Sequence, residues 1–334
     1  MALCSELDHP NVINLVEIIL EDKCIFMVFE YAEHDLLQII QHHTQPTRHP
    51  IPASAIKSII FQLLNGLYYL HSNWVLHRDL KPANIMVTSK GEVRIGDLGL
   101  ARLFYKPLHS LYNGDKVVVT IWYRAPELLL GSKHYTPAVD LWAVGCIFAE
   151  LLSLRPIFKG EEAKLDGKKT VPFQRNQMQK IVDILGMPTK ESWPGLVHQP
   201  DFPQLQTLSS QGFHSNSKAT GLDAWYWNTL RSSNYEAGSS AGTPGQQGLE
   251  LLSMLLEYDP SKRLTAQDAL QHPYFSANGE KVTANCFEGM NTQYPHRRVS
   301  QDDNDIRTSS LPGTKRNGLP DDSFAGRPTK RIKE

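Results

Sequence analysis

Residues 77–86, HRDLKPANIM, gather side chains that could handle a phosphate group. Asp79, Lys81 and Asn84 fall within six residues, and Asp97 follows at the start of DLGLAR. One carboxylate can accept a proton from a hydroxyl, and the lysine can neutralise charge on a transferring phosphoryl group. The asparagine oxygen and the second carboxylate are hard oxygen ligands that suit Mg²⁺. This spacing therefore indicates a site for phosphate chemistry.

The elements around this stretch are expected to hold it in place. Two short strand-like runs, NIMV and VRIG, flank a turn at residues 88–92 and would fix the loop on rigid supports. Before them, residues 54–73 carry apolar side chains at helical spacing, which predicts a helix. After them, Thr136 and Pro137 are expected to open an apolar helix as its N-cap and first helical residue.

The beginning of the chain, an internal stretch and the end differ in composition from the motif region. Residues 12–20 and 24–29 are β-prone runs separated by a tight turn, which predicts a hairpin. A small β-rich start and a larger, mainly helical body suggest two unequal lobes of one domain. Residues 209–248 are rich in Ser and Gly and are interpreted as a flexible insertion. From about residue 278 the chain is polar and weakly periodic, which predicts a mostly disordered tail.

The composition argues against several classes of protein. The 334 residues carry 34 Lys+Arg against 35 Asp+Glu, so no overall attraction to nucleic acid or membrane is expected. The four cysteines include no CxxC pair, which argues against a disulfide framework or zinc site and fits a reducing compartment. No signal peptide is recognised. The most apolar stretch, residues 138–152, is too short to span a bilayer and contains Asp140 and Glu150.

Three motifs, HRDLKPAN, DLG and WYRAPE, occur in this order and at spacings that resemble a eukaryotic Ser/Thr protein kinase. The alternative is that Asp79 and Asp97 are merely turn or cap residues, but the ordered set of motifs argues against it. The resemblance implies an α+β, bilobal protein-kinase fold with a β-rich small lobe and a mainly α-helical large lobe. It also implies ATP and Mg²⁺ as cofactors.

The resemblance implies a catalytic role for each matching position. Asp79 would be the catalytic base, supported together with Lys81 by Thr120. Lys81 would contact the γ-phosphate of ATP. Asn84 and Asp97 would bind Mg²⁺.

The nucleotide-binding positions carry over in the same way. Phe29 would be the gatekeeper, and the backbones of Glu30 and Ala32 would bond adenine. Asp35 would lie near the ribose, and Met86 would form the floor of the adenine pocket.

Three further positions would have structural roles. Glu127 and Arg263 resemble the ion pair that locks the large lobe. Asp140 resembles the acidic residue that braces the catalytic loop. The simpler alternative for Asp140 is a stabilising charge in the first turn of a helix.

The segment VVVTIWYRAPE narrows the resemblance to the cyclin-dependent branch, which favours a proline after the target Ser or Thr. A MAP kinase would show a Thr-x-Tyr pair before this segment, and none is present. Relatives carry an activating Thr where this chain has Asp115, which offers a single charge to Arg78 and Arg102 in place of a phosphate. Leu98 also replaces the Phe of the commoner DFG motif.

These departures and segments such as KPLHSLYNGDK resemble the kinase of the Mediator complex in its fungal form. That resemblance implies a cyclin C partner, other Mediator kinase-module subunits, and protein substrates including the RNA polymerase II tail. It also implies a nuclear location, without membrane or direct nucleic-acid binding. The terminal RPTKRIKE is a candidate nuclear import signal, and a solvated charge run is the commoner alternative. Nearby aspartates oppose contact with DNA.

The beginning of the chain raises two hypotheses. No GxGxxG or VAIK-like stretch occurs in it, so by the family pattern the Gly-rich loop, the strand lysine and the helix glutamate lie upstream of Met1. Residues 1–32 are then a remnant of an incomplete small lobe, residues 33–277 the large lobe, and residues 278–334 the tail. The first hypothesis is a truncated form of a working kinase, and the intact catalytic residues favour it; the chain as given is then expected to be inactive, because the Gly-rich loop, strand lysine and helix glutamate are absent from it. The second is a catalytically inactive scaffold or decoy in Mediator.

Overall fold

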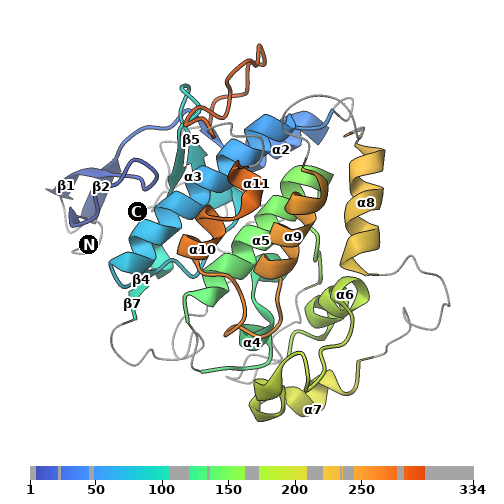
Figure 1. The fold of residues 1–334 in the computed structure, drawn as a ribbon. Coiled ribbons are helices and arrows are strands. Elements are labelled where there is room, and N and C mark those ends of the chain that lie inside the picture. Colours follow the sequence, from blue (N-terminus) through green and yellow to red (C-terminus); the bar gives the residue numbers. More distant parts are fainter. Residues whose placement is uncertain are drawn as a thin grey trace, which may run out of the picture. The chain divides into compact units, whose positions relative to one another are not determined.

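A small β-hairpin comes first along the chain, and a mainly helical body that also carries two short sheets follows (Figure 1). The computed structural model describes residues 5–21, 24–44, 49–104, 120–133, 136–161, 173–208, 221–233, 235, 244–276 and 282–297. All of these residues belong to one compact unit. The arrangement confirms the α+β class with small N-terminal sheets and a helical C-terminal lobe.

The first sheet is a hairpin, as the sequence predicts. Strands β1 (Leu15–Glu21) and β2 (Cys24–Phe29) pair antiparallel, with Leu20 opposite Ile25. The segment before the hairpin is anchored to the body, because Ile13 N donates to the Ile95 carbonyl at 2.9 Å. Both strands expose large apolar side chains, namely Val16, Ile18, Ile19, Leu20, Ile25, Phe26, Met27 and Val28.

Two long helices form the centre of the body. Helix α3 (Ala53–Ser72) buries one face, and every residue of α5 (Ala138–Ser153) is buried. Complete burial explains why α5 is apolar all round. Helix α5 begins one residue later than predicted, although Thr136 Oγ1 still accepts a hydrogen bond from Ala138 N at 3.4 Å.

Shorter helices surround this pair. They are α2 (Leu36–Thr44), α4 (Pro126–Leu129), α6 (Arg175–Leu185), α7 (Phe202–Leu205), α8 (Leu222–Ser232), α9 (Gly245–Leu255), α10 (Ala266–Leu270) and α11 (Pro273–Ser276). Helix α8 lies within the stretch interpreted as a flexible insertion, and its Tyr226 and Leu230 are buried. Residues 209–220, 234 and 236–243 of that stretch lie outside the described residues.

Two small sheets carry the motifs with chemical potential. Strands β3 (His34–Asp35), β5 (Ile85–Val87) and β6 (Val93–Ile95) form one antiparallel sheet, and β4 (Val75–Leu76) pairs with β7 (Arg102–Leu103) in the other. The 3₁₀ helices η1 (Pro82–Asn84), η2 (Leu98–Leu100) and η3 (Ile121–Tyr123) follow the loops between them, and η4 (Pro194–His198) lies beyond α6. The predicted loop between β4 and β5 is therefore held at both ends.

Residues 282–297, here named the strap, lack helices and strands but pack against the body. Cys286 N donates to the Gly91 carbonyl at 3.0 Å, and the His43 Nε2 atom lies 2.8 Å from the Tyr294 hydroxyl. Gly91 has a φ of +75°, and an added Cβ there would lie 2.0 Å from the Asn285 Oδ1 atom. The strap belongs to the tail that was predicted to be mostly disordered from residue 278, and the rest of that tail, residues 278–281 and 298–334, lies outside the described residues.

Among the described helices, none is long and apolar enough to cross a membrane.

Candidate active site

The loop between β4 and β5 brings three of the predicted side chains together. Asp79 is buried, and its Oδ2 atom lies 2.9 Å from the Lys81 ammonium nitrogen. The Asn84 Nδ2 atom donates to the same oxygen at 3.1 Å and to the Asp79 carbonyl at 2.8 Å. A lysine and an amide thus orient one carboxylate, which is the arrangement that a positioned base requires.

Asp140, in the first turn of α5, accepts hydrogen bonds from the backbone of this loop. Its Oδ1 atom accepts a hydrogen bond from Arg78 N at 2.9 Å, and its Oδ2 atom accepts one from His77 N at 3.0 Å. The Nε2 atom of His71 lies 2.9 Å from the same Oδ2. Burial opposes ionisation, but these contacts hold the pKa of Asp140 below its usual value. Arg78 has a φ of +72°, and the paired hydrogen bonds stabilise that strained backbone.

The predicted metal ligands lie on adjoining segments. Gly96 N donates to the Asn84 carbonyl at 2.8 Å, which places Asp97 directly after a residue bonded to Asn84. Asp97 is exposed and adopts a left-handed conformation, with a φ of +54°. Since the Asn84 Nδ2 atom binds Asp79, its Oδ1 atom is the one left to face a cation.

The donor set fits Mg²⁺ bound together with phosphate. Within the described part of the chain, no group of three or more His, Cys, Asp or Glu side chains could hold a metal ion. Mg²⁺ usually takes only one or two protein ligands and completes its shell with phosphate oxygens and water. Asn84 and Asp97 therefore suit a cation that arrives with a nucleotide.

The predicted nucleotide-binding residues follow the hairpin. Glu30 N donates to the Asn14 carbonyl at 3.0 Å, so the Glu30 carbonyl is the backbone group left for the predicted adenine contact, and the Glu30 carboxylate pairs with Arg94. Phe29 ends β2 and is partly buried, and Ala32 is fully buried.

Asp35 and Met86 stand opposite each other across strands β3 and β5. The Asp35 Oδ1 atom accepts a hydrogen bond from Gln38 N at 2.8 Å, and burial raises the pKa of its carboxyl group. The register therefore brings the expected ribose contact and the expected adenine floor together.

The strap adds a residue that the sequence did not suggest. Arg297 N donates to the Glu33 carbonyl at 2.6 Å, and its Nη1 atom lies 2.7 Å from the Met86 sulfur. The same guanidinium acts electrostatically on Asp35. Sequence reasoning missed Arg297 because the strap has neither periodicity nor a motif.

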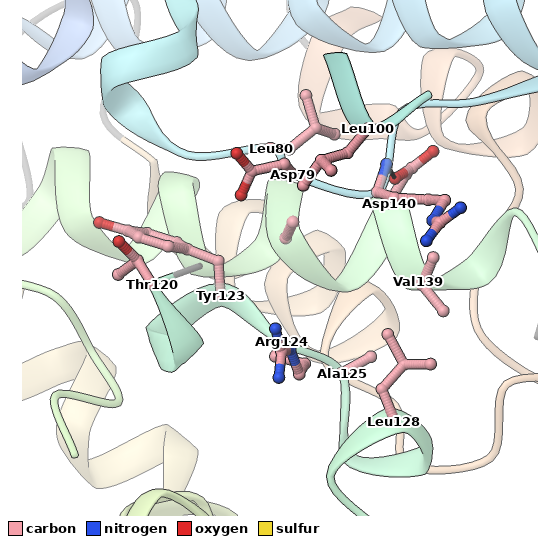
Figure 2. Close-up of a pocket in the computed structure, with 12 residues that line it drawn as sticks. Asp79, Leu80, Leu100, Thr120, Tyr123, Arg124, Ala125, Leu128, Val139 and Asp140 are labelled. Carbon is pink, nitrogen blue, oxygen red and sulfur yellow. Dashed lines mark hydrogen bonds between the residues drawn. The ribbon is translucent and has the colours of Figure 1, made fainter. Parts of the chain in front are cut away.

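Figure 2 shows Asp79, Thr120 and Tyr123 around one pocket, which the catalytic loop, η3, α4 and α5 enclose. Thr120 therefore lines the same pocket as Asp79, and its support of Asp79 and Lys81 stays a prediction. The Tyr123 hydroxyl donates to the Glu150 carboxylate at 2.6 Å, and burial raises the pKa of Glu150 to about 7. Neither Tyr123 nor Glu150 was predicted as a site residue.

The remaining predicted positions lie around this pocket. Arg78 lines it, whereas Arg102 is exposed on β7 and donates to the Ala101 carbonyl at 2.8 Å. Asp115 lies outside the described residues. Arg263 binds Glu127 through two hydrogen bonds of 2.8 and 3.1 Å, and both side chains are buried.

Comparison with known proteins supplies independent evidence for the family to which the chain belongs. A family model described as "Protein kinase domain" matches residues 1–275. The chain is 73% identical over 335 residues to serine/threonine-protein kinase ssn3 of Aspergillus niger, covering 100% of this chain and 78% of that protein. It is 70% identical over 355 residues to SSN3 of Chaetomium globosum, covering 100% of this chain and 69% of that protein.

A solved structure, that of the yeast RNA Pol II CTD kinase CTDK-1 complex, is also similar. It aligns with a TM-score of 0.65 at 33% identity and covers 84% of this chain and 81% of that chain.

Proposed function

The chain belongs to the protein kinase family, within the fungal ssn3 group of serine/threonine kinases, and from this premise we propose its substrates, cofactors and partners. It transfers the γ-phosphate of ATP to Ser or Thr residues of nuclear transcription proteins, among them the RNA polymerase II tail. Its partners are a cyclin C-type cyclin and the other subunits of the Mediator kinase module. The oriented carboxylate of Asp79, held by Lys81 and Asn84, is the observation that carries the proposal.

Each residue of the site has a defined task in this reaction. Asp79 accepts the proton of the substrate hydroxyl, and Lys81 stabilises charge on the γ-phosphate. Asn84 and Asp97 hold Mg²⁺, which when bound neutralises charge on the phosphates. Asp140 fixes the backbone that carries Asp79. The Met86 side chain and the Glu30 and Ala32 backbones receive the adenine.

A kinase assay with matched variants tests this proposal. The chain, co-purified with a cyclin C, is given Mg²⁺, labelled ATP and peptides of the RNA polymerase II tail repeat. Replacing the proline after each target Ser by Ala should lower transfer, as proline preference requires. Asp79→Asn should lower kcat by about 10³-fold and leave ATP binding nearly unchanged. Equal turnover by this variant would remove Asp79 from its role.

A non-catalytic role in Mediator is the second candidate. It differs from the first candidate in predicting that the chain binds its partners without transferring phosphate. Cyclin capture without transfer above the Asp79→Asn level would support the scaffold or decoy. Transfer well above that level would exclude it for this chain.

A further inference from the structure

A groove lies between α8 and α9, and its lining shares no residue with the pocket of Figure 2. Figure 1 shows the two helices side by side. The groove has a volume of about 440 Å³ and is lined by Asp223, Trp227, Gln246, Leu249, Glu250, Ser253, Met254 and His272. The groove is open to solvent along its length, so a segment of another protein can reach its lining.

The walls of the groove carry two large apolar side chains that are partly exposed to solvent. Trp227 is 38% exposed and Met254 is 42% exposed, while Leu249 is buried. The indole ring of Trp227 packs edge-on against the Tyr226 ring at 5.4 Å, which fixes it to α8. Trp dominates the binding energy of many protein interfaces, and Met adapts to varied partners.

The charged side chains that line the groove are acidic. Asp223 and Glu250 are exposed, and no Lys or Arg is among the described residues of the lining. Burial lowers the pKa of His272, although Glu250 opposes the shift, so burial disfavours a positive charge on this ring. Arg231, the nearest arginine on α8, donates to the Trp227 carbonyl and to Asn228 of its own helix.

We propose that the α8–α9 groove binds a peptide segment of another protein that carries a Lys or Arg beside an apolar residue. The cation would lie between Asp223 and Glu250, at the face of Trp227, where both ion pairing and a cation–π contact are available. The apolar neighbour would cover Met254. A phosphorylated or acidic segment would be repelled by the same carboxylates.

Peptide binding to the full chain tests this assignment without any dependence on kinase activity. The probe is a fluorescein-labelled peptide of sequence GLKRLG, and the matched probe is GLEELG. Fluorescence anisotropy should show saturable binding of the first, weakened by added NaCl, and none of the second.

Matched variants locate the binding. Trp227→Ala should weaken binding about tenfold, and the double change Asp223→Asn with Glu250→Gln about fivefold. The control is Asp183→Asn with Glu191→Gln, which removes two exposed carboxylates that do not line the groove and should leave the affinity unchanged.

Three results would overturn the assignment. The first is equal binding of GLKRLG and GLEELG. The second is unchanged affinity when both groove carboxylates are neutralised; because these side chains are exposed, that variant should remain folded. The third is self-association of the chain that Trp227→Ala abolishes, without peptide binding, which would make a second copy the occupant.

Discussion

At the scale of single residues, the protein shifts the pKa of a buried carboxyl group beside the pocket, that of Glu150. It is buried within α5 and accepts the Tyr123 hydroxyl, whose ring lines the pocket beside Asp79. Burial raises its pKa from 4.5 to about 7. The folded protein therefore keeps this proton between about pH 4.5 and pH 7, where the unfolded chain loses it.

Replacing Glu150 by Gln should change the dependence of stability on pH. The raised pKa contributes fully to the free energy of unfolding below about pH 4.5, and this contribution is lost as the pH rises through 7. Ionised Glu150 is therefore less stabilising than a neutral side chain at pH 8. The variant keeps an acceptor for Tyr123 without the charge. Its thermal midpoint should equal that of the wild type at pH 5 and exceed it at pH 8. The corresponding gain in the free energy of unfolding at pH 8 should be at most about 3 kcal/mol.

Glu161→Gln is the control for this change, because Glu161 is exposed. Parallel curves for wild type and Glu150→Gln across pH 5 to 8 would contradict the raised pKa.

Asp140 provides a second test at the scale of one residue. It receives the backbone N–H groups of His77 and Arg78 as well as the His71 ring, and an asparagine offers only one side-chain oxygen. Asp140→Asn should therefore leave a buried donor unsatisfied and cost about 1–3 kcal/mol. Since the loop carries Asp79, kcat should fall by about 10²-fold while the KM for ATP changes little. A change confined to KM would disprove the bracing role.

At the scale of elements, local sequence patterns decided what could be predicted. Helix α3 was predicted because its apolar residues recur at helical spacing, the β1–β2 hairpin because two β-prone runs flank a tight turn, and α5 because Thr136 and Pro137 precede an apolar stretch. The strap was missed because its order comes from distant partners: Ser58 Oγ donates to the Thr283 carbonyl at 2.6 Å, and Cys286 N binds Gly91. Such long-range contacts leave no local pattern. Helix α8 was missed for a related reason, since Ser- and Gly-rich residues flank it.

The motif residues of the site were predictable because HRDLKPAN and DLG fix their spacing. Arg297 and Glu150 were not, since the first reaches Met86 across 211 residues and the second meets Tyr123 from another helix. A single sequence does not record which distant segments fold together.

The strap's contact with the β5–β6 turn can be tested at Gly91. Gly91→Ala would place a Cβ 2.0 Å from the Asn285 Oδ1 atom and 2.7 Å from Cys286 N, at a φ of +75°. Strain and collision should together cost about 2–5 kcal/mol. Hydrogen exchange at residues 283–287 should become faster because the strap must move away.

The control is Gly289→Ala, which has a similar φ of +73° but nothing within 4 Å of the added Cβ. It should show only the strain, about 1–3 kcal/mol. Equal losses of stability in the two variants would mean that the strap contact contributes nothing.

At the scale of the whole molecule, one buried ion pair joins segments that are far apart in sequence. Arg263 binds Glu127 of α4 and donates to the carbonyls of Ala138 and Glu257 at 2.8 and 2.9 Å. Its guanidinium also lies over the Trp142 ring, 5.1 Å from the centroid. The pair therefore ties α4, next to the pocket, to α5 and to the loop after α9.

Breaking this pair from either side should destabilise the entire body, because the remaining charge is buried without compensation. Glu127→Met and Arg263→Met should each cost about 3–5 kcal/mol, and the arginine change should cost more because it also leaves backbone carbonyls unpaired. The double variant should lose less than the sum of the two, since no buried charge then remains. Thermal unfolding of all three variants measures this coupling. The adjacent Lys262→Met is the control, because Lys262 is at the surface and its change should fall within about 0.5 kcal/mol. Strict additivity would show that Glu127 and Arg263 stabilise the lobe independently, and the pair would not be what joins these segments.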